Sequence, residues 1–301
     1  MKKHTIGDNK TIKTGITQAF TEVRKEFPFS GYMNSLNKYV VIISQITREY
    51  PSGSKILSIG SGPCDLEAIL SKLGYNVTAI DDLKDHWHLI GKNRKRIKDF
   101  AKKMDIKLIV QSAGSSQLKE DCYDVVLLID IIEHLHSRQR ELLNYTISSL
   151  KPDGLLLIET PNAVALAKRL KVLFGKSNQV NANFIYWNIG EYRSHIREYT
   201  KSELKEILLY QNLTAVSPKM INIMIDTIEG GNLLRNVIVK TYKLVSELYP
   251  NFRDTILISG KKPKNWHPVN NSIETWRKYL TLIEKYNLDS ESDEVLLNKM
   301  S

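Results

Sequence analysis

The chain has 301 residues, of which 42% are hydrophobic, and a formal net charge of +10. This length allows one large or two small domains with a sizeable core. No stretch approaches the roughly 18 uninterrupted apolar residues that span a bilayer, and the opening MKKHTIGDNK lacks the apolar segment of a secretory signal. Cys64 and Cys122 are too far apart in sequence for metal-ligand spacing and argue against a disulfide framework. We therefore expect a cytoplasmic protein without a transmembrane segment.

The positive charge would suit an anionic partner. It is densest in residues 92–103, KNRKRIKDFAKK, where Phe100 alone is aromatic. Single-strand binders interleave aromatic side chains with basic ones. A solvated helix face is therefore the favoured interpretation, and nucleic acid is disfavoured as a partner.

The first 50 residues indicate a separate helical segment. Residues 1–14 are polar and are expected to be loosely attached. Apolar positions then recur at intervals of three and four in residues 16–27 and 36–49, which predicts two amphipathic helices.

A strand, a glycine turn and a helix follow in order. Residues 55–59 are rich in apolar and β-branched side chains, Gly60-Ser61-Gly62 comes next, and a helical pattern ends at Gly74. The next strand, residues 76–80, ends in Asp81 and Asp82. A carboxylate about 20 residues past the glycine turn is where a doubly wound fold binds a ribose.

Helices and strands continue to alternate. We expect a helix over 84–103, strands over 107–111 and 123–130, a helix over 138–150, a turn at 151–154 and a strand over 155–159. This alternation predicts βαβ units and a parallel sheet.

The regular alternation of strands and helices ends after residue 162. A helix over 164–174 and a long polar and aromatic loop precede a helix over 201–209 that begins at Thr200 or Ser202. Strands are expected over 213–217 and 254–259, with a helix within 228–248 and another over 273–286. The last helix carries an apolar stripe that could pack on the core or on a second subunit: Trp276, Tyr279, Leu280 and Ile283.

Five segments in this order resemble class I S-adenosylmethionine-dependent methyltransferases, closest to the branch of the ubiquinone-pathway O-methyltransferases and of sugar and natural-product methyltransferases. They are ILSIGSGPCD, VTAIDD, YDVVLLIDIIEHL, LKPDGLLLIETPN and HIREYTKSEL, within residues 36–217. A nicotinamide enzyme would share the first two segments and has no reason for the EHL and KPDG motifs.

The resemblance implies an α/β fold: a doubly wound, mostly parallel seven-stranded sheet of Rossmann-like type, with the final strand antiparallel. N-terminal helices (1–50) precede a methyltransferase domain (51–262) that carries inserts at 163–198 and 219–250, and a C-terminal helix and tail follow (263–301). The implied cofactor is S-adenosylmethionine, with S-adenosylhomocysteine as the product. Its implied binding residues are Gly60, Ser61, Gly62, Asp81, Asp82, Leu83, Ser112, Ala113, Ile129, Asp130 and Ile131.

Three residues depart from the family pattern. Ser58 and Ser112 stand where relatives often carry acids, and Cys64 replaces a third glycine. Each serine removes a charge-assisted contact of about 1.5–3 kcal/mol. Weak cofactor binding, or a cofactor-binding protein that has lost catalysis, is therefore an alternative.

Histidines are the candidate bases, because O-methylation requires removal of the acceptor proton and imidazole titrates near neutral pH. His134 follows the fourth strand and His195 lies in the long loop, with Glu133 as an orienting or catalytic partner. Arg193, Arg197 and Tyr186 are candidate contacts to the acceptor.

Asp130, Glu133, His134 and His195 also form a set of oxygen and nitrogen ligands that suits a divalent metal. The set is similar to that of small-RNA 2′-O-methyltransferases, although Asp130 stands where a glutamate is expected. Metal-assisted methylation of RNA is thus a second alternative. Our leading prediction is O-methylation of a small-molecule or glycan-type acceptor without a metal. Peripheral membrane contact through residues 163–198, to reach a quinone, is a third interpretation.

Overall fold

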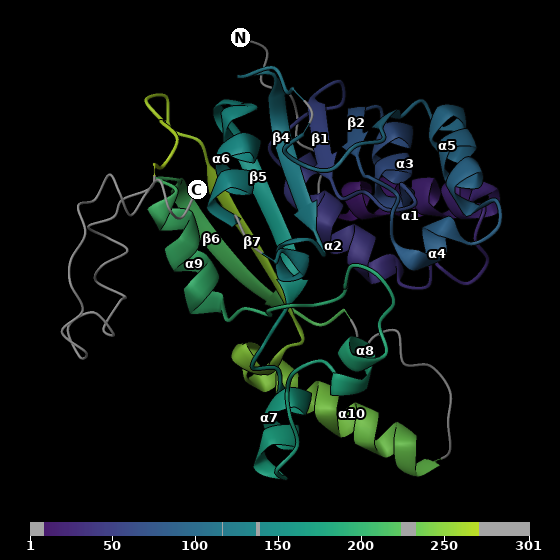
Figure 1. Cartoon of the computed structure of the whole chain (residues 1–301), viewed down its shortest axis with the longest axis vertical. Coiled ribbons are helices and arrows are strands. Elements are labelled where there is room, and N and C mark those ends of the chain that lie inside the picture. The colour runs from purple at the N-terminus through teal and green to yellow at the C-terminus, as the bar shows by residue number, and fades with distance from the viewer. Residues whose placement is uncertain (1–8, 116, 137–138, 224–232, 271–301) are drawn as a thin grey trace. The chain divides into compact units, whose positions relative to one another are not determined.

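A seven-stranded sheet forms the centre of the computed structural model, which describes residues 9–115, 117–136, 139–223 and 233–270 (Figure 1). The strands are β1 (Lys55–Ile59), β2 (Asn76–Ile80), β3 (Lys107–Ile109), β4 (Tyr123–Ile129), β5 (Leu150–Pro161), β6 (Thr214–Ile221) and β7 (Thr255–Lys261). Their order is β3-β2-β1-β4-β5-β7-β6, and β7 runs antiparallel to both β5 and β6. The predicted sheet and its antiparallel final strand are confirmed.

Both faces of the sheet are buried, because successive side chains of its apolar strands point to opposite sides. In β4, Val125 and Leu127 join one hydrophobic cluster while Val126 and Leu128 join the other. The helices of this part of the chain are α1 (Asn9–Glu26), α2 (Leu36–Thr47), α3 (Asp65–Lys72), α4 (His86–Leu89), α5 (Asn93–Lys103), α6 (Gln139–Ser148) and α9 (Lys201–Tyr210), with α1 packed on α2 and α3.

The N-terminal helix is longer than expected. α1 begins at Asn9, so the prediction that the chain is loosely attached as far as residue 14 is wrong for residues 9–14. Ile12 packs against the core cluster and Ile16 is fully buried within it. These apolar contacts hold the first turns of a segment that is otherwise polar.

Two other boundaries differ from the sequence prediction. The single helix expected over 84–103 is divided into α4 and α5, with Gly91 at a φ of +55° between them. The turn expected at 151–154 lies inside β5, where Asp153 has a φ of +63° and donates its N–H to the carbonyl of Lys262. The pairing of β4 with β5 shifts register beside it, so the Pro-Asp-Gly sequence makes an irregularity within the strand.

The inserted cap contains α7 (Leu166–Leu173), α8 (Ala182–Tyr186) and α10 (Leu233–Leu248), which Figure 1 draws together beyond one end of the sheet. α7 contacts α10 where the N–H of Ala167 donates to Tyr242 Oη at 3.4 Å. Thr200, one of the two expected caps, begins α9 through a capping box with Glu203.

Residues up to His267 form one compact unit, and residues 268–301 are assigned to a second. The helix predicted over 273–286, with its stripe of Trp276, Tyr279, Leu280 and Ile283, lies outside the described residues. No helix in the described ranges is long and apolar enough to cross a membrane.

Candidate active site

A cavity of about 880 Å³ opens at the carboxyl ends of β1, β2 and β4. Parallel α/β sheets bind their ligands at this edge, where the loops after the strands converge. A second cavity, of about 990 Å³, lies at the opposite ends of β1 and β2 and is lined in part by Lys55, Lys98 and Lys107. The first cavity is the candidate active site, because most of the cofactor-binding residues predicted from sequence line it, together with His134 and Arg193.

The glycine loop forms the floor of this cavity. Gly60 and Gly62 have φ values of +71° and +53°. A Cβ on Gly60 would lie 1.9 Å from Ile131 Cδ1, whereas a Cβ on Gly62 would meet nothing within 4 Å. Cys64, which replaces the family's third glycine, also adopts a left-handed φ of +65°. The loop thus keeps a glycine-type backbone at all three positions.

Asp81 lies at the end of β2 and connects two loops. Its carboxylate accepts the N–H of Gly62 at 2.8 Å and the N–H of Leu83 at 2.7 Å. Burial nevertheless raises the pKa of Asp81 to about 6. A group that donates hydrogen bonds to this carboxylate would lower its pKa again.

The remaining predicted cofactor residues divide into two groups. Lining the cavity are Ser61, Asp82, Ser112, Ala113, Ile129, Asp130 and Ile131. Leu83 is outside the lining, with a fully buried side chain and a φ of +51°. Ser112 Oγ lies 3.4 Å from Asp82 Oδ2, which connects the ends of β2 and β3.

Asp130 is held by a partner that the sequence did not reveal. Lys38, on α2, pairs with it at 2.6 Å and lies 3.9 Å from the fully buried Glu159. Burial alone would raise the pKa of Asp130, but the Lys38 ammonium holds it below its ordinary value. The N-terminal helices therefore contribute a charged side chain to the cavity wall.

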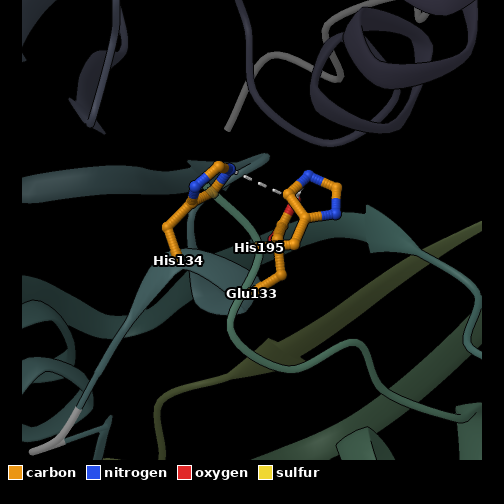
Figure 2. Close-up of side chains that lie close together, drawn as sticks. All are labelled: Glu133, His134 and His195. Carbon is orange, nitrogen blue, oxygen red and sulfur yellow. Dashed lines mark ion pairs between the residues drawn. The ribbon is translucent and has the colours of Figure 1, made fainter. Parts of the chain in front are cut away.

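Glu133, His134 and His195 form a cluster beside the cavity (Figure 2). The Nε2 atoms of His134 and His195 lie 4.0 Å and 3.9 Å from Glu133 Oε1. Glu133 is completely buried; its Oε2 accepts a hydrogen bond from Thr160 at 2.8 Å, and its Oε1 has no hydrogen-bond partner among the described residues. The loop that carries His195 is fastened here, because the N–H of Ile196 donates to the Glu133 carbonyl at 2.7 Å.

The two histidines are in different electrostatic environments. Desolvation lowers the pKa of His134, whose Nδ1 lies 2.9 Å from the carbonyl of Arg193. That nitrogen must donate, so Nε2 of the neutral ring is left as the basic atom. The hydrogen bond to Glu198, at 3.2 Å, raises the pKa of His195. Burial raises the pKa of Glu133 to about 7.

Two of the predicted acceptor contacts, Arg193 and Arg197, touch the cluster through backbone atoms. Arg193 lines the cavity and is bonded to Asp82 at 2.8 Å and to Asp85 at 2.9 Å. Arg197 pairs with Glu203 at 2.8 Å outside the lining, and Tyr186, on α8, is 76% exposed.

Three further residues of the cavity, Tyr39, Asp65 and Glu67, were not predicted from the sequence. Tyr39 Oη donates to Asp65 at 2.5 Å, and Glu67 lies buried at the start of α3. A carboxylate at position 67 interrupts a run of buried apolar residues, 66 and 68–70, and that contrast could have marked it from sequence.

The described lining is acidic overall. Its carboxylates are Asp65, Glu67, Asp81, Asp82, Asp85, Asp130 and Glu191, and its lysines and arginines are Lys38, Lys84 and Arg193. The positive charge of the whole chain is therefore not concentrated at this site. Such a lining favours cationic or neutral ligands over polyanions.

Comparisons with known proteins agree with this geometry. Residues 36–217 match a family model described as a methyltransferase domain. The ubiquinone biosynthesis O-methyltransferase of Rickettsia typhi is 30% identical over 268 residues, which cover 88% of this chain and 92% of that protein. Its counterpart from Rickettsia prowazekii is 29% identical and covers 81% and 82%.

Among solved structures, phosphoethanolamine N-methyltransferase 2 of Haemonchus contortus in complex with S-adenosyl-L-methionine superposes with a TM-score of 0.52 at 15% identity. The match covers 83% of this chain, which spans 57% of the length of that neighbour. At this identity the likeness is one of fold.

Proposed function

The chain belongs to the class I S-adenosylmethionine-dependent methyltransferases, and from this premise we propose that it O-methylates a small-molecule or glycan-type acceptor with His134 as the base. S-adenosylmethionine supplies an activated methyl group on a sulfonium and leaves as S-adenosylhomocysteine. What this chain must add is a binding site, an in-line position for the acceptor and a place for its proton.

The cavity residues fit this cofactor. The open space above Gly62 allows close approach to the glycine loop, and Asp81 can accept further hydrogen bonds from a ribose diol. The acidic lining suits the positive charge of the sulfonium and of the amino-acid end.

The single observation that carries the assignment of the base is the environment of His134. It lines the cavity, its lowered pKa keeps the ring neutral near pH 7, and its Nδ1 is occupied by the Arg193 carbonyl. Nε2 is then free to accept a proton from a hydroxyl. His195 lies outside the lining and has a raised pKa. It is better suited to carry the positive charge that stabilises the Glu133 carboxylate.

The acceptor is proposed to be uncharged or weakly charged at its reacting end. Seven carboxylates against three lysines and arginines in the described lining disfavour a phosphate-rich RNA terminus. The relatives named as ubiquinone biosynthesis O-methyltransferases support a hydroxyl as the methylated group. A panel of phenolic and sugar acceptors, with mass spectrometry of the methylated product, tests both points. O-methyl products are expected, and methyl transfer only to amines added to the same panel would contradict the proposal.

Metal assistance is the second candidate for the chemistry of the same cluster. Glu133, His134 and His195 offer three ligand atoms within 4.8 Å of one another. In both histidines Nδ1 is hydrogen-bonded to an oxygen atom, as the second ring nitrogen of metal-binding histidines is. Loss of turnover in EDTA that Mg²⁺ or Mn²⁺ restores would establish this alternative, and full activity in chelator would exclude it.

A membrane-borne acceptor is supported by a separate surface, which we call the apolar cap. It consists of exposed side chains at the end of α7 and directly after it, and on α8 and directly after it: Leu173, Phe174, Phe184, Ile185, Tyr186, Trp187 and Ile189. Each is more than half exposed; Lys171 lies just before them in sequence and Lys176 lies between Phe174 and Phe184. Apolar side chains beside basic ones suit the interface of an anionic bilayer.

A further inference from the structure

Ser58 and Glu67 share a buried hydrogen bond beside the glycine loop. Ser58 Oγ donates to Glu67 Oε1 at 2.5 Å, and both residues are 2% exposed. The second oxygen, Glu67 Oε2, has no hydrogen-bond partner among the described residues. A buried carboxyl oxygen without a partner is costly, so its retention needs an explanation.

The position of the Glu67 carboxyl explains why it is retained. Ser58, Gly60 and Glu67 all line the candidate active site. The glycine loop leads directly into α3, and its first turns bring Glu67 back against the end of β1. The acid that the family often carries at the end of β1 is replaced by Ser58, and the structure places another acid in contact with that serine.

We propose that Glu67 provides the carboxylate that β1 lacks and binds the α-ammonium group of S-adenosylmethionine through Oε2, while Ser58 fixes its orientation through Oε1. The proposal rests on the cofactor of the family and is independent of the acceptor and of the base. It also removes the reason to regard Ser58 as a mark of weak binding.

The charges around Glu67 agree with a cationic ligand. Desolvation, followed by the nearby carboxylate of Asp65, raises the pKa of Glu67 to about 8. The other titratable groups that face it are also acidic or phenolic: Tyr32, Tyr39, Cys64 and Asp81. An arriving ammonium would favour the ionised carboxylate, so binding should release the proton that Glu67 holds near neutral pH.

The test compares two ligands that differ in the group Glu67 is proposed to bind. S-adenosylhomocysteine carries the amino-acid end, and 5′-methylthioadenosine lacks it. For Glu67→Gln, isothermal titration calorimetry should show S-adenosylhomocysteine binding weakened about 10- to 100-fold and methylthioadenosine binding unchanged within about twofold. Asp81→Asn is the control, because Asp81 is proposed to bind the ribose that both ligands contain. This variant should weaken the binding of both ligands by the same factor. Equal affinity of Glu67→Gln and wild type for S-adenosylhomocysteine, or equal losses for both ligands, would overturn the proposal.

A second measurement needs no variant and decides the matter if Glu67→Gln does not fold. Calorimetry of the wild-type protein at pH 7.5, in two buffers of different ionisation enthalpy, reports protons released on binding. S-adenosylhomocysteine should release most of one proton more than methylthioadenosine does. Identical proton release for the two ligands would overturn the proposal. Neither result depends on methyl transfer, so failure here is distinct from failure of the proposed O-methylation.

Discussion

His134 and His195 meet edge to face, with ring centroids 4.8 Å apart, and both turn Nε2 toward the buried carboxyl of Glu133. One ring comes from the end of β4 and the other from the loop before α9. The contact brings together two candidate bases that the sequence placed 61 positions apart, at 134 and 195. Their unequal environments lead to the first prediction.

Replacement of His134 by Ala should lower kcat about 10²–10⁴-fold, the usual contribution of a general base. Binding of S-adenosylhomocysteine should stay within about twofold, because Asp81 and the glycine loop are untouched. Steady-state kinetics and calorimetry give the two values. His136→Ala is the matched control, since that ring also bonds to a carbonyl of the same loop, at 2.6 Å from Tyr192 O. An equal loss of kcat in both variants would show a structural role only.

Stability of the ligand-free protein should respond to Glu67 in a defined direction. Its carboxyl keeps its proton up to a pKa of about 8 when folded and loses it near 4.5 when unfolded. The stability that the protonated carboxyl contributes is therefore complete below about pH 4.5, decreases as pH rises above that value, and is fully lost once pH passes about 8. Glu67→Gln mimics the protonated form. Its Tm should match wild type at about pH 4, below the unfolded pKa, and exceed it by about 4 °C or more at pH 8.5, as differential scanning calorimetry would report.

A Tm difference between Glu67→Gln and wild type that is the same at about pH 4 and at pH 8.5 would contradict this prediction. It would mean that Glu67 is ionised, or solvated, in the folded protein throughout that range.

Arg193 is expected to control the lifetime of the bound cofactor. Its guanidinium connects the loop over the cavity to Asp82 and Asp85. Without these bonds the loop should open more readily, so Arg193→Ala should raise the dissociation rate of S-adenosylhomocysteine about tenfold in stopped-flow measurements. Arg197→Ala, which removes an exposed pair with Glu203, is the control and should leave the rate unchanged. An unchanged rate in Arg193→Ala would leave this residue free for its predicted contact to the acceptor.

The apolar cap should bind anionic vesicles. Replacing Phe184 and Trp187 by Asp removes two side chains that are 69% and 74% exposed, and adds charge where insertion would occur. Co-sedimentation with phosphatidylglycerol vesicles should fall about tenfold or more. Leu209→Asp, at a 51% exposed position on α9, should have no effect. If wild type does not sediment with vesicles, a membrane-borne acceptor is excluded.

The fold could be predicted from sequence because it depends on local patterns, and the cofactor because the segments that carry them resemble a known family. Apolar runs such as residues 125–128 define the strands, and the spacing from Gly62 to Asp81 identifies the edge of the sheet that is expected to bind the ribose. Boundaries were less accurate where one residue decides them, as at Gly91 or within the irregular start of β5.

The site was less predictable because its contacts are long-range. Lys38 reaches Asp130 across 92 positions, and no periodicity connects a lysine on an amphipathic helix to a particular carboxylate. Glu67 lies only nine positions from Ser58, but its role depends on how α3 turns back onto β1. The roles of His134, His195 and the arginines remain predictions for experiment.

The central claim is tested most directly by transfer of a labelled methyl group from S-adenosylmethionine to the phenolic and sugar acceptors, measured in EDTA for wild type and His134→Ala. The account predicts full wild-type turnover in chelator and a loss of at least about 100-fold in the variant. Undiminished transfer by His134→Ala would contradict it. So would wild-type turnover that stops in EDTA and returns with Mn²⁺, which would make Glu133, His134 and His195 a metal site.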